Sequence, residues 1–221
     1  MFRVFKIAVV VLLFSIQLGN SNGVERRYRH KMAYHKTDVM NACLKTAPQY
    51  GFEPIQLFAL ARQESAKTPD GHFDASIPRL EQGFFQHYIL GNHQLPTGLP
   101  TTALTLLATS YGCWQIMGYE LWRLKWMQER FDRLDNIAWK DTLQSPYSQL
   151  AMVQALDEFC MDIDIQCKYA CKLLTEKRNT ANGKGEFKGI TNKEEMMYLY
   201  YNGGGDIDYG KKVLKWKEEG M

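Results

Sequence analysis

The chain has 221 residues, of which 45% are hydrophobic and 23% are charged, and its formal net charge is +3. This composition is typical of a globular protein with one sizeable core, so we expect a single domain. Residues 1–23 hold two basic residues and no acidic one, so removing them leaves a net charge of +1. Such a nearly neutral chain lacks the concentrated basic patch of nucleic-acid-binding proteins, which argues against that class.

Residues 1–23 have the pattern of an export signal. Arg3 and Lys6 precede an apolar run from Ile7 to Ile16, which is too short to span a bilayer comfortably. Cleavage after the small residue Ser21 is expected, but the site is not an A-x-A sequence, so an uncleaved anchor is the alternative. We therefore expect a protein exported to the periplasm or cell envelope, attached to the membrane only through such an anchor.

The five cysteines are Cys43, Cys113, Cys160, Cys167 and Cys171. Export permits disulfides, but the odd number leaves at least one thiol over. Cys167 and Cys171 are four residues apart on one helix face, where a disulfide would be strained. We expect one bridge or none, and we expect no metal, because no C-x-x-C or H-E-x-x-H pattern occurs. The chemistry expected below needs no cofactor.

Residues 24–36 are basic and form a lead-in to a domain that we expect to fill residues 37–221. Its first helix runs from about residue 37 to the stop at Gly51. Pro54 suits the first turn of the second helix, which carries an apolar run and ends at Glu64.

Residues 66–100 are rich in proline, glycine, histidine and aspartate, and we expect a long loop there that forms one wall of a cleft. The strand pattern is sparse and predicts at most a small hairpin between Phe73 and Tyr88. Aromatic residues of this loop either line the cleft or anchor the loop on the core, and for Phe84 and Phe85 we favour anchoring.

Apolar periodicity and capping residues predict further helices over residues 101–109, 119–130, 146 to a break near 162, 165–177, 193–201 and 209–217. Residues 178–192 are polar and contain glycines, so we expect a surface loop. The predicted fold class is mainly α, or α+β, with a small or absent β-hairpin.

Glu64 is the first candidate for chemistry. A glutamate at the C-terminal end of a half-buried helix has apolar neighbours and faces the negative end of the helix dipole, and both raise its pKa. A general acid working near neutral pH needs such an environment. Two further stretches, Ser110–Gly118 and Tyr200–Gly205, combine polar side chains with glycines.

In this order the stretches resemble the lysozyme-like lytic transglycosylases and the bacterial or phage N-acetylmuramidases, which cleave the glycan strands of peptidoglycan. The soluble lytic transglycosylase (SLT) pattern has Glu-Ser at a helix end, then Ser-x-Gly-x-x-Gln-Ile-Met, then Tyr-Asn-x-Gly. Glu64–Ser65, Ser110–Met117 and Tyr201–Gly204 match it. Arg79–Phe85 is similar to a further N-acetylmuramidase piece, but Gln82-Gly83 replaces its usual basic residue and histidine. The resemblance covers residues 37–217 and implies a lysozyme-like fold.

The resemblance implies that Glu64 donates a proton to the leaving oxygen. In a transglycosylase the same glutamate then acts as base toward the sugar's own C6 hydroxyl, which gives a 1,6-anhydro end. A hydrolase uses water and usually a second carboxylate, for which Glu81 is the best candidate. A structural ion pair of Glu81 with Arg79 or Arg62 is an equal alternative.

Further site residues follow from the same resemblance. Ser110 and Gln115 would lie opposite Glu64 and bind the sugar or its N-acetyl group, and the Tyr201 hydroxyl would hold the Glu64 carboxyl. Ser65 either touches substrate or caps a backbone group, and Asn202 is mainly structural.

The expected function is cleavage of the β-1,4 bond between N-acetylmuramic acid and N-acetylglucosamine, with peptidoglycan glycan strands as partner and no nucleic acid. We prefer the transglycosylase outcome to hydrolysis, because one acid is clear and a second is not. The alternatives are a non-catalytic peptidoglycan-binding protein on the same fold, and a tethered factor that opens the wall for secretion or conjugation machinery.

Overall fold

The computed structural model describes residues 33–67, 72–75, 78–89, 99–127 and 146–220. The expected export signal and most of the basic lead-in lie outside these residues. Within them, every helix is too short or too polar to cross a membrane.

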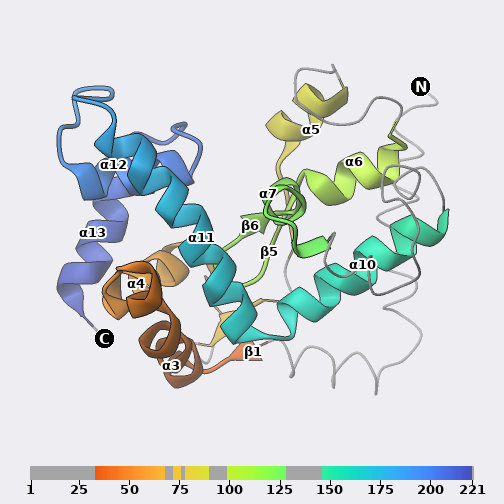
Figure 1. Ribbon diagram of the computed structural model, residues 1–221, viewed down its shortest axis with the longest axis horizontal. Helices are drawn as coiled ribbons and strands as arrows, with labels where there is room; N and C mark the ends of the chain where they lie inside the picture. The colour runs from red at the N-terminus through yellow and green to blue at the C-terminus, as the bar shows by residue number, and fades with distance from the viewer. Residues whose placement is uncertain (1–32, 68–71, 76–77, 90–98, 128–145, 221) are drawn as a thin grey trace.

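The described chain is mainly helical, as the sequence predicts (Figure 1). The helices are α3 (Lys36–Thr46), η1 (Ala47–Tyr50, a 3-10 turn), α4 (Pro54–Glu64), α5 (Gln82–Ile89), α6 (Thr101–Leu107), α7 (Gly118–Arg123), α10 (Pro146–Cys160), α11 (Ile163–Asn182), α12 (Lys193–Tyr201) and α13 (Tyr209–Glu219).

Within the described residues, six short strands form two antiparallel sheets. The strands are β1 (Ala33–Tyr34), β2 (Ala66–Lys67), β3 (Phe73–Asp74), β4 (Arg79–Leu80), β5 (Thr109–Tyr111) and β6 (Ile116–Met117). One sheet has the order β1-β3-β2 and the other β4-β5-β6. The hairpin expected between Phe73 and Tyr88 is therefore wrong: β3 and β4 belong to different sheets, and Tyr88 lies in α5. The consecutive described strands that pair are β2 with β3 and β5 with β6, and Gly112, with its positive φ, allows the turn between β5 and β6.

The helices fall into two groups in Figure 1. Helices α3, α4, α11, α12 and α13 pack together on one side, and α5, α6, α7 and α10 lie on the other with the β4-β5-β6 sheet. The long helix α11 belongs to the first group and begins next to the end of α10. Helix α4 packs against α3, α11 and α13, and its apolar run from Leu57 to Ala61 is completely or almost completely buried.

Local signals explain the bounds of α4 and the start of α11. Pro54 occupies the first turn of α4, and Ser65 ends the helix by taking an extended conformation. Asp162 caps α11 by accepting a hydrogen bond from the Ile165 backbone N–H. This helix is longer than predicted, because the polar residues after 177 contain no breaker before Gly183.

Two predictions for the regions before and after Ser110–Gly118 need correction. Residues 66–100 are not irregular throughout: α5 forms because Gln82–Ile89 contains no proline, while Pro78 precedes it. The helix predicted over residues 119–130 is interrupted: α7 ends at Arg123, because Lys125 takes a positive φ of 68°. Residues 126–127 are helical again, and residues 128–130 lie outside the described residues.

Candidate functional site

The end of α4 is the point where the three sequence stretches meet. The Ser65 hydroxyl donates a hydrogen bond to the Cys113 carbonyl oxygen at 2.7 Å. The Trp114 indole N–H donates to the Leu57 carbonyl oxygen at 2.9 Å, and the Tyr201 hydroxyl donates to the Trp114 carbonyl oxygen at 2.7 Å. The β5–β6 turn is thus attached to α4 and α12, next to Glu64.

A buried glutamine holds this turn. Gln166 is fully buried, its side-chain oxygen accepts from the Cys113 backbone N–H at 2.8 Å, and its amide donates to the Cys160 carbonyl oxygen at 2.9 Å. Gly112 has a φ of +76°, and a Cβ there would lie 2.6 Å from the Gln166 side-chain oxygen. Only glycine fits this position. Sequence reasoning missed Gln166, whose only signal was a polar residue within a predicted helix.

Gln115 completes the turn. Its backbone has a φ of +46°, which is uncommon for a residue other than glycine, and its side-chain amide donates to the Gly112 carbonyl oxygen at 2.9 Å. The residue is 9% exposed. The amide therefore stabilises the turn, and sugar binding by Gln115 stays a prediction.

Glu64 is the buried acid of the site. Only 6% of its side-chain surface is exposed, and the Tyr209 hydroxyl donates a hydrogen bond to its Oε1. Burial raises the pKa of Glu64 from 4.5 to about 6, although the Tyr209 hydrogen bond and the nearby Arg79 guanidinium act in the opposite direction. A carboxyl with such a pKa exchanges its proton close to neutral pH, which is what a general acid requires.

The partner of Glu64 differs from the predicted one. We expected the Tyr201 hydroxyl to hold the carboxyl, and this is wrong, because that hydroxyl donates to the Trp114 carbonyl oxygen. Tyr209, the first residue of α13, takes its place. The chain reverses after α12 through Gly203 and Gly204, which both have positive φ, and this turn leads to Tyr209. Burial raises the pKa of both tyrosine hydroxyls well above its usual value.

Arg79 connects Glu64 to Glu81. Its Nε donates to Glu81 Oε1 at 2.6 Å, and its Nη2 lies 3.7 Å from Glu64 Oε2. The Ser110 hydroxyl also donates to Glu81 Oε1, at 3.3 Å. This arrangement follows from the pairing of β4 with β5, which places Arg79 opposite Ser110. The predicted ion pair of Glu81 with Arg79 is present, whereas Arg62 lies near Glu219 instead.

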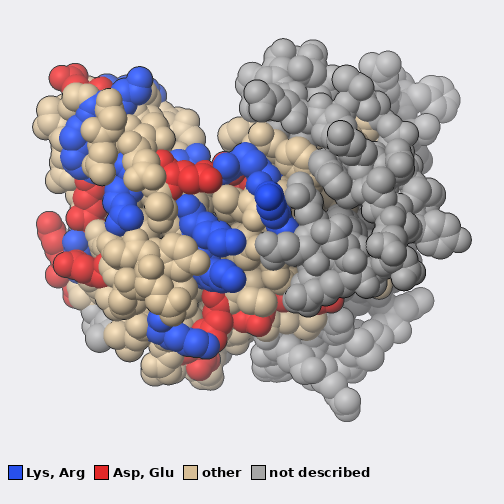
Figure 2. All heavy atoms as spheres, in the orientation of Figure 1, with Lys and Arg blue, Asp and Glu red and all other residues tan. Residues whose placement is uncertain are grey.

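The aromatic residues of the segment 66–100, which we expected to form one wall of a cleft, divide between two roles. Phe73 is buried and packs on Phe58, and Phe85 is half-buried against the core. Phe84 is 36% exposed, and a Cβ added to Gly203 would lie 3.9 Å from its ring. The start of α5 therefore faces the turn after α12. In the view of Figure 2 acidic and basic side chains are mixed on the described surface.

All five cysteines are buried free thiols, so of the two expectations, one disulfide or none, the structure has none. Among the residues that the structure describes, no cluster of three or more histidine, cysteine, aspartate or glutamate side chains could hold a metal ion.

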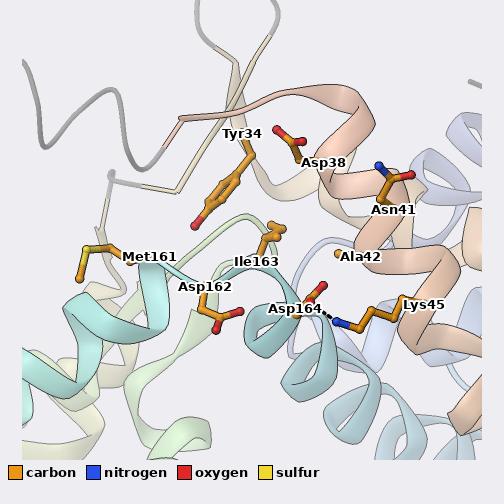
Figure 3. A pocket seen from close by; sticks show the side chains of 9 residues that line it. All are labelled: Tyr34, Asp38, Asn41, Ala42, Lys45, Met161, Asp162, Ile163 and Asp164. Atoms are coloured by element: carbon orange, nitrogen blue, oxygen red, sulfur yellow. Dashed lines mark hydrogen bonds and ion pairs between the residues drawn. The ribbon is translucent and has the colours of Figure 1, made fainter.

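A pocket of about 520 Å³ lies elsewhere, between α3 and the start of α11 (Figure 3). Its lining residues are Tyr34, Asp38, Asn41, Ala42, Lys45, Met161, Asp162, Ile163 and Asp164. Its acids have local roles: Asp38 and Asp162 bond backbone N–H groups at helix starts, and Asp164 pairs with Lys45. None of the predicted site residues lines this pocket.

Comparisons of the chain with protein-family models, curated proteins and solved structures gave no match.

Proposed function

We propose that the chain is an exported enzyme that cleaves the β-1,4 bond between N-acetylmuramic acid and N-acetylglucosamine in peptidoglycan, on a lysozyme-like fold. The observation that supports this most strongly is Glu64, a buried carboxyl with a pKa of about 6 at a helix end, held by a tyrosine hydroxyl. The resemblance of the three stretches supplies the substrate class.

The proposed chemistry begins with protonated Glu64. Its proton passes to the glycosidic oxygen while the bond from that oxygen to C1 breaks, and positive charge develops on the sugar ring. The ionised carboxylate then removes a proton from the sugar's C6 hydroxyl, whose oxygen bonds to C1. This second step restores the acid and yields a 1,6-anhydro end.

The single-carboxylate route suits the surroundings of Glu81. One of its oxygens already accepts from both Arg79 and Ser110, so Glu81 is held as an ion-pair partner. In the hydrolytic alternative, Glu81 would instead activate water as the second carboxylate.

The four predicted substrate-binding residues, Ser65, Ser110, Gln115 and Tyr201, all have polar atoms bonded within the protein. We assign them first to positioning the turn and the carboxylates. Contacts of these residues with sugar stay predictions, as do attachment through an N-terminal anchor and association with secretion or conjugation machinery.

Product analysis tests the proposal. Purified peptidoglycan is incubated with the wild type and with Glu64→Gln, which keeps the shape of the side chain and removes its proton, and released fragments are examined by mass spectrometry. Wild type is expected to give 1,6-anhydro ends and the variant almost no fragments. Reducing ends would favour the hydrolase, and binding without any release by wild type would favour a non-catalytic peptidoglycan-binding protein.

A further inference from the structure

Arg79 lies between two carboxylates and contacts them unequally. Its Nε forms a 2.6 Å hydrogen bond with Glu81, whereas its nearest approach to Glu64 is 3.7 Å, beyond hydrogen-bond distance. The acid that Arg79 contacts more closely is also the more exposed one: 30% of the Glu81 side chain is exposed, and only 6% of the Glu64 side chain. The guanidinium is therefore committed to the more exposed acid.

The other groups near Glu64 are neutral at ordinary pH. Tyr209 on α13 donates to the carboxyl, Tyr201 on α12 donates to a backbone carbonyl, and Ser110 on β5 donates to Glu81. Within the described part of the chain, Arg79 and Glu81 are thus the charged groups that act on Glu64. Arg79 favours the ionised form of this carboxyl, and Glu81 favours the protonated form.

We propose that Arg79 is a positioning residue shared by the two carboxylates, and that its pairing with Glu81 leaves Glu64 protonated before cleavage. This inference rests on the proposed function. Because the guanidinium already bonds Glu81, it compensates a negative charge on Glu64 only in part, which favours the protonated form of Glu64. After Glu64 has given its proton to the glycosidic oxygen, its new negative charge lies 3.7 Å from Arg79 Nη2, which stabilises it until the proton is recovered.

The shared guanidinium predicts shifts of opposite sign. In Arg79→Gln the pKa of Glu64 rises, because a positive charge is lost. In Glu81→Gln it falls, because a negative charge is lost and Arg79 is released toward Glu64. Since 54% of the Arg79 side chain is exposed, solvent weakens both effects, and we expect shifts of about 0.5–1 pH unit.

The test is a carbon-13 NMR titration of glutamate side chains in the full chain without substrate, with the Glu64 signal assigned through Glu64→Gln. Arg79→Lys retains the charge and should shift the Glu64 pKa less than Arg79→Gln does. Lys45→Gln, which removes the remote ion pair of the pocket in Figure 3, should leave it unchanged. An unchanged Glu64 pKa in both Arg79→Gln and Glu81→Gln, or shifts of the same sign, would overturn the proposal.

Cleavage of peptidoglycan is then measured against pH with the same variants. The pH at which the rate falls on the alkaline side of the profile should be higher for Arg79→Gln than for wild type, and lower for Glu81→Gln. If the NMR shifts appear but wild type cleaves nothing, the shared guanidinium stands and the proposed function fails. If Glu81→Gln abolishes cleavage while the Glu64 pKa is unchanged, Glu81 is a second catalytic carboxylate and the sharing by Arg79 is wrong.

Discussion

The burial of Glu64 predicts that Glu64→Gln becomes more stable relative to the wild type as the pH rises from acidic to neutral. In the folded state the pKa is about 6, and in the unfolded chain it is close to 4.5. A rise of about 1.5 units corresponds to about 2 kcal/mol of preference for the protonated form. Because the folded pKa is the higher one, folding of the wild type loses this amount as the pH rises from about 4.5 to above 6.

A glutamine at position 64 carries no charge at any pH, and its side-chain oxygen can still accept from Tyr209. The difference in unfolding free energy between Glu64→Gln and wild type should therefore grow by about 2 kcal/mol between pH 4 and pH 7.5, in favour of the variant. Urea denaturation followed by circular dichroism at both pH values measures it.

The control for this prediction is Glu218→Gln, which removes an exposed carboxylate on α13 and should give almost the same difference at both pH values. A pH-independent difference for Glu64→Gln would refute the reasoning, because it would mean that the folded protein does not disfavour the ionised carboxyl. A variant that loses stability only at pH 7.5 would refute it more strongly.

Three further predictions concern the groups around the acid and the thiols. In Tyr209→Phe the Glu64 pKa should rise by about one unit, since a hydrogen bond to the charged form of the carboxyl is lost. The pH at which the cleavage rate falls on the alkaline side should rise with it, and Tyr200→Phe is the control. In Gly112→Ala unfolding should need about 2–4 kcal/mol less, because of the positive φ and the contact with Gln166, whereas an alanine at Gly185, which has no neighbour within 4 Å, should change stability little in urea titration. In a thiol assay with Ellman's reagent the native protein should react slowly, because all five cysteines are buried, and the denatured protein should show five thiols without reductant; fewer than five would reveal a disulfide.

Helix ends that depend on neighbouring residues could be predicted from sequence. The bounds of α12, Lys193–Tyr201, agree with the prediction, and so do the first residue of α13 and the last residue of α4. Asn192 caps the start of α12, and Asn202 with the glycines after it follows the end of this helix, so both of its bounds have a local signal. Strands β3 and β4 belong to different sheets because each pairs with a strand distant in the sequence, and no local signal encodes these partners.

The same distinction applies to the candidate site. The burial of Glu64 follows from the apolar run that precedes it, so its raised pKa could be predicted. The identity of its tyrosine partner could not, because Tyr201 and Tyr209 are separated by a glycine turn whose path sequence does not fix. Gln166 was missed for a similar reason: its partners lie on the β5–β6 turn and at the end of α10.

The central claim is that the Glu64 proton cleaves a glycan strand. The most direct measurement is the release of soluble fragments from purified peptidoglycan at pH 5–6 by equal amounts of wild type, Glu64→Gln and Glu218→Gln, each first shown to be folded. The account predicts that wild type and Glu218→Gln release fragments at similar rates and that Glu64→Gln is slower by at least about 100-fold. Release by Glu64→Gln at a rate close to that of wild type would contradict it.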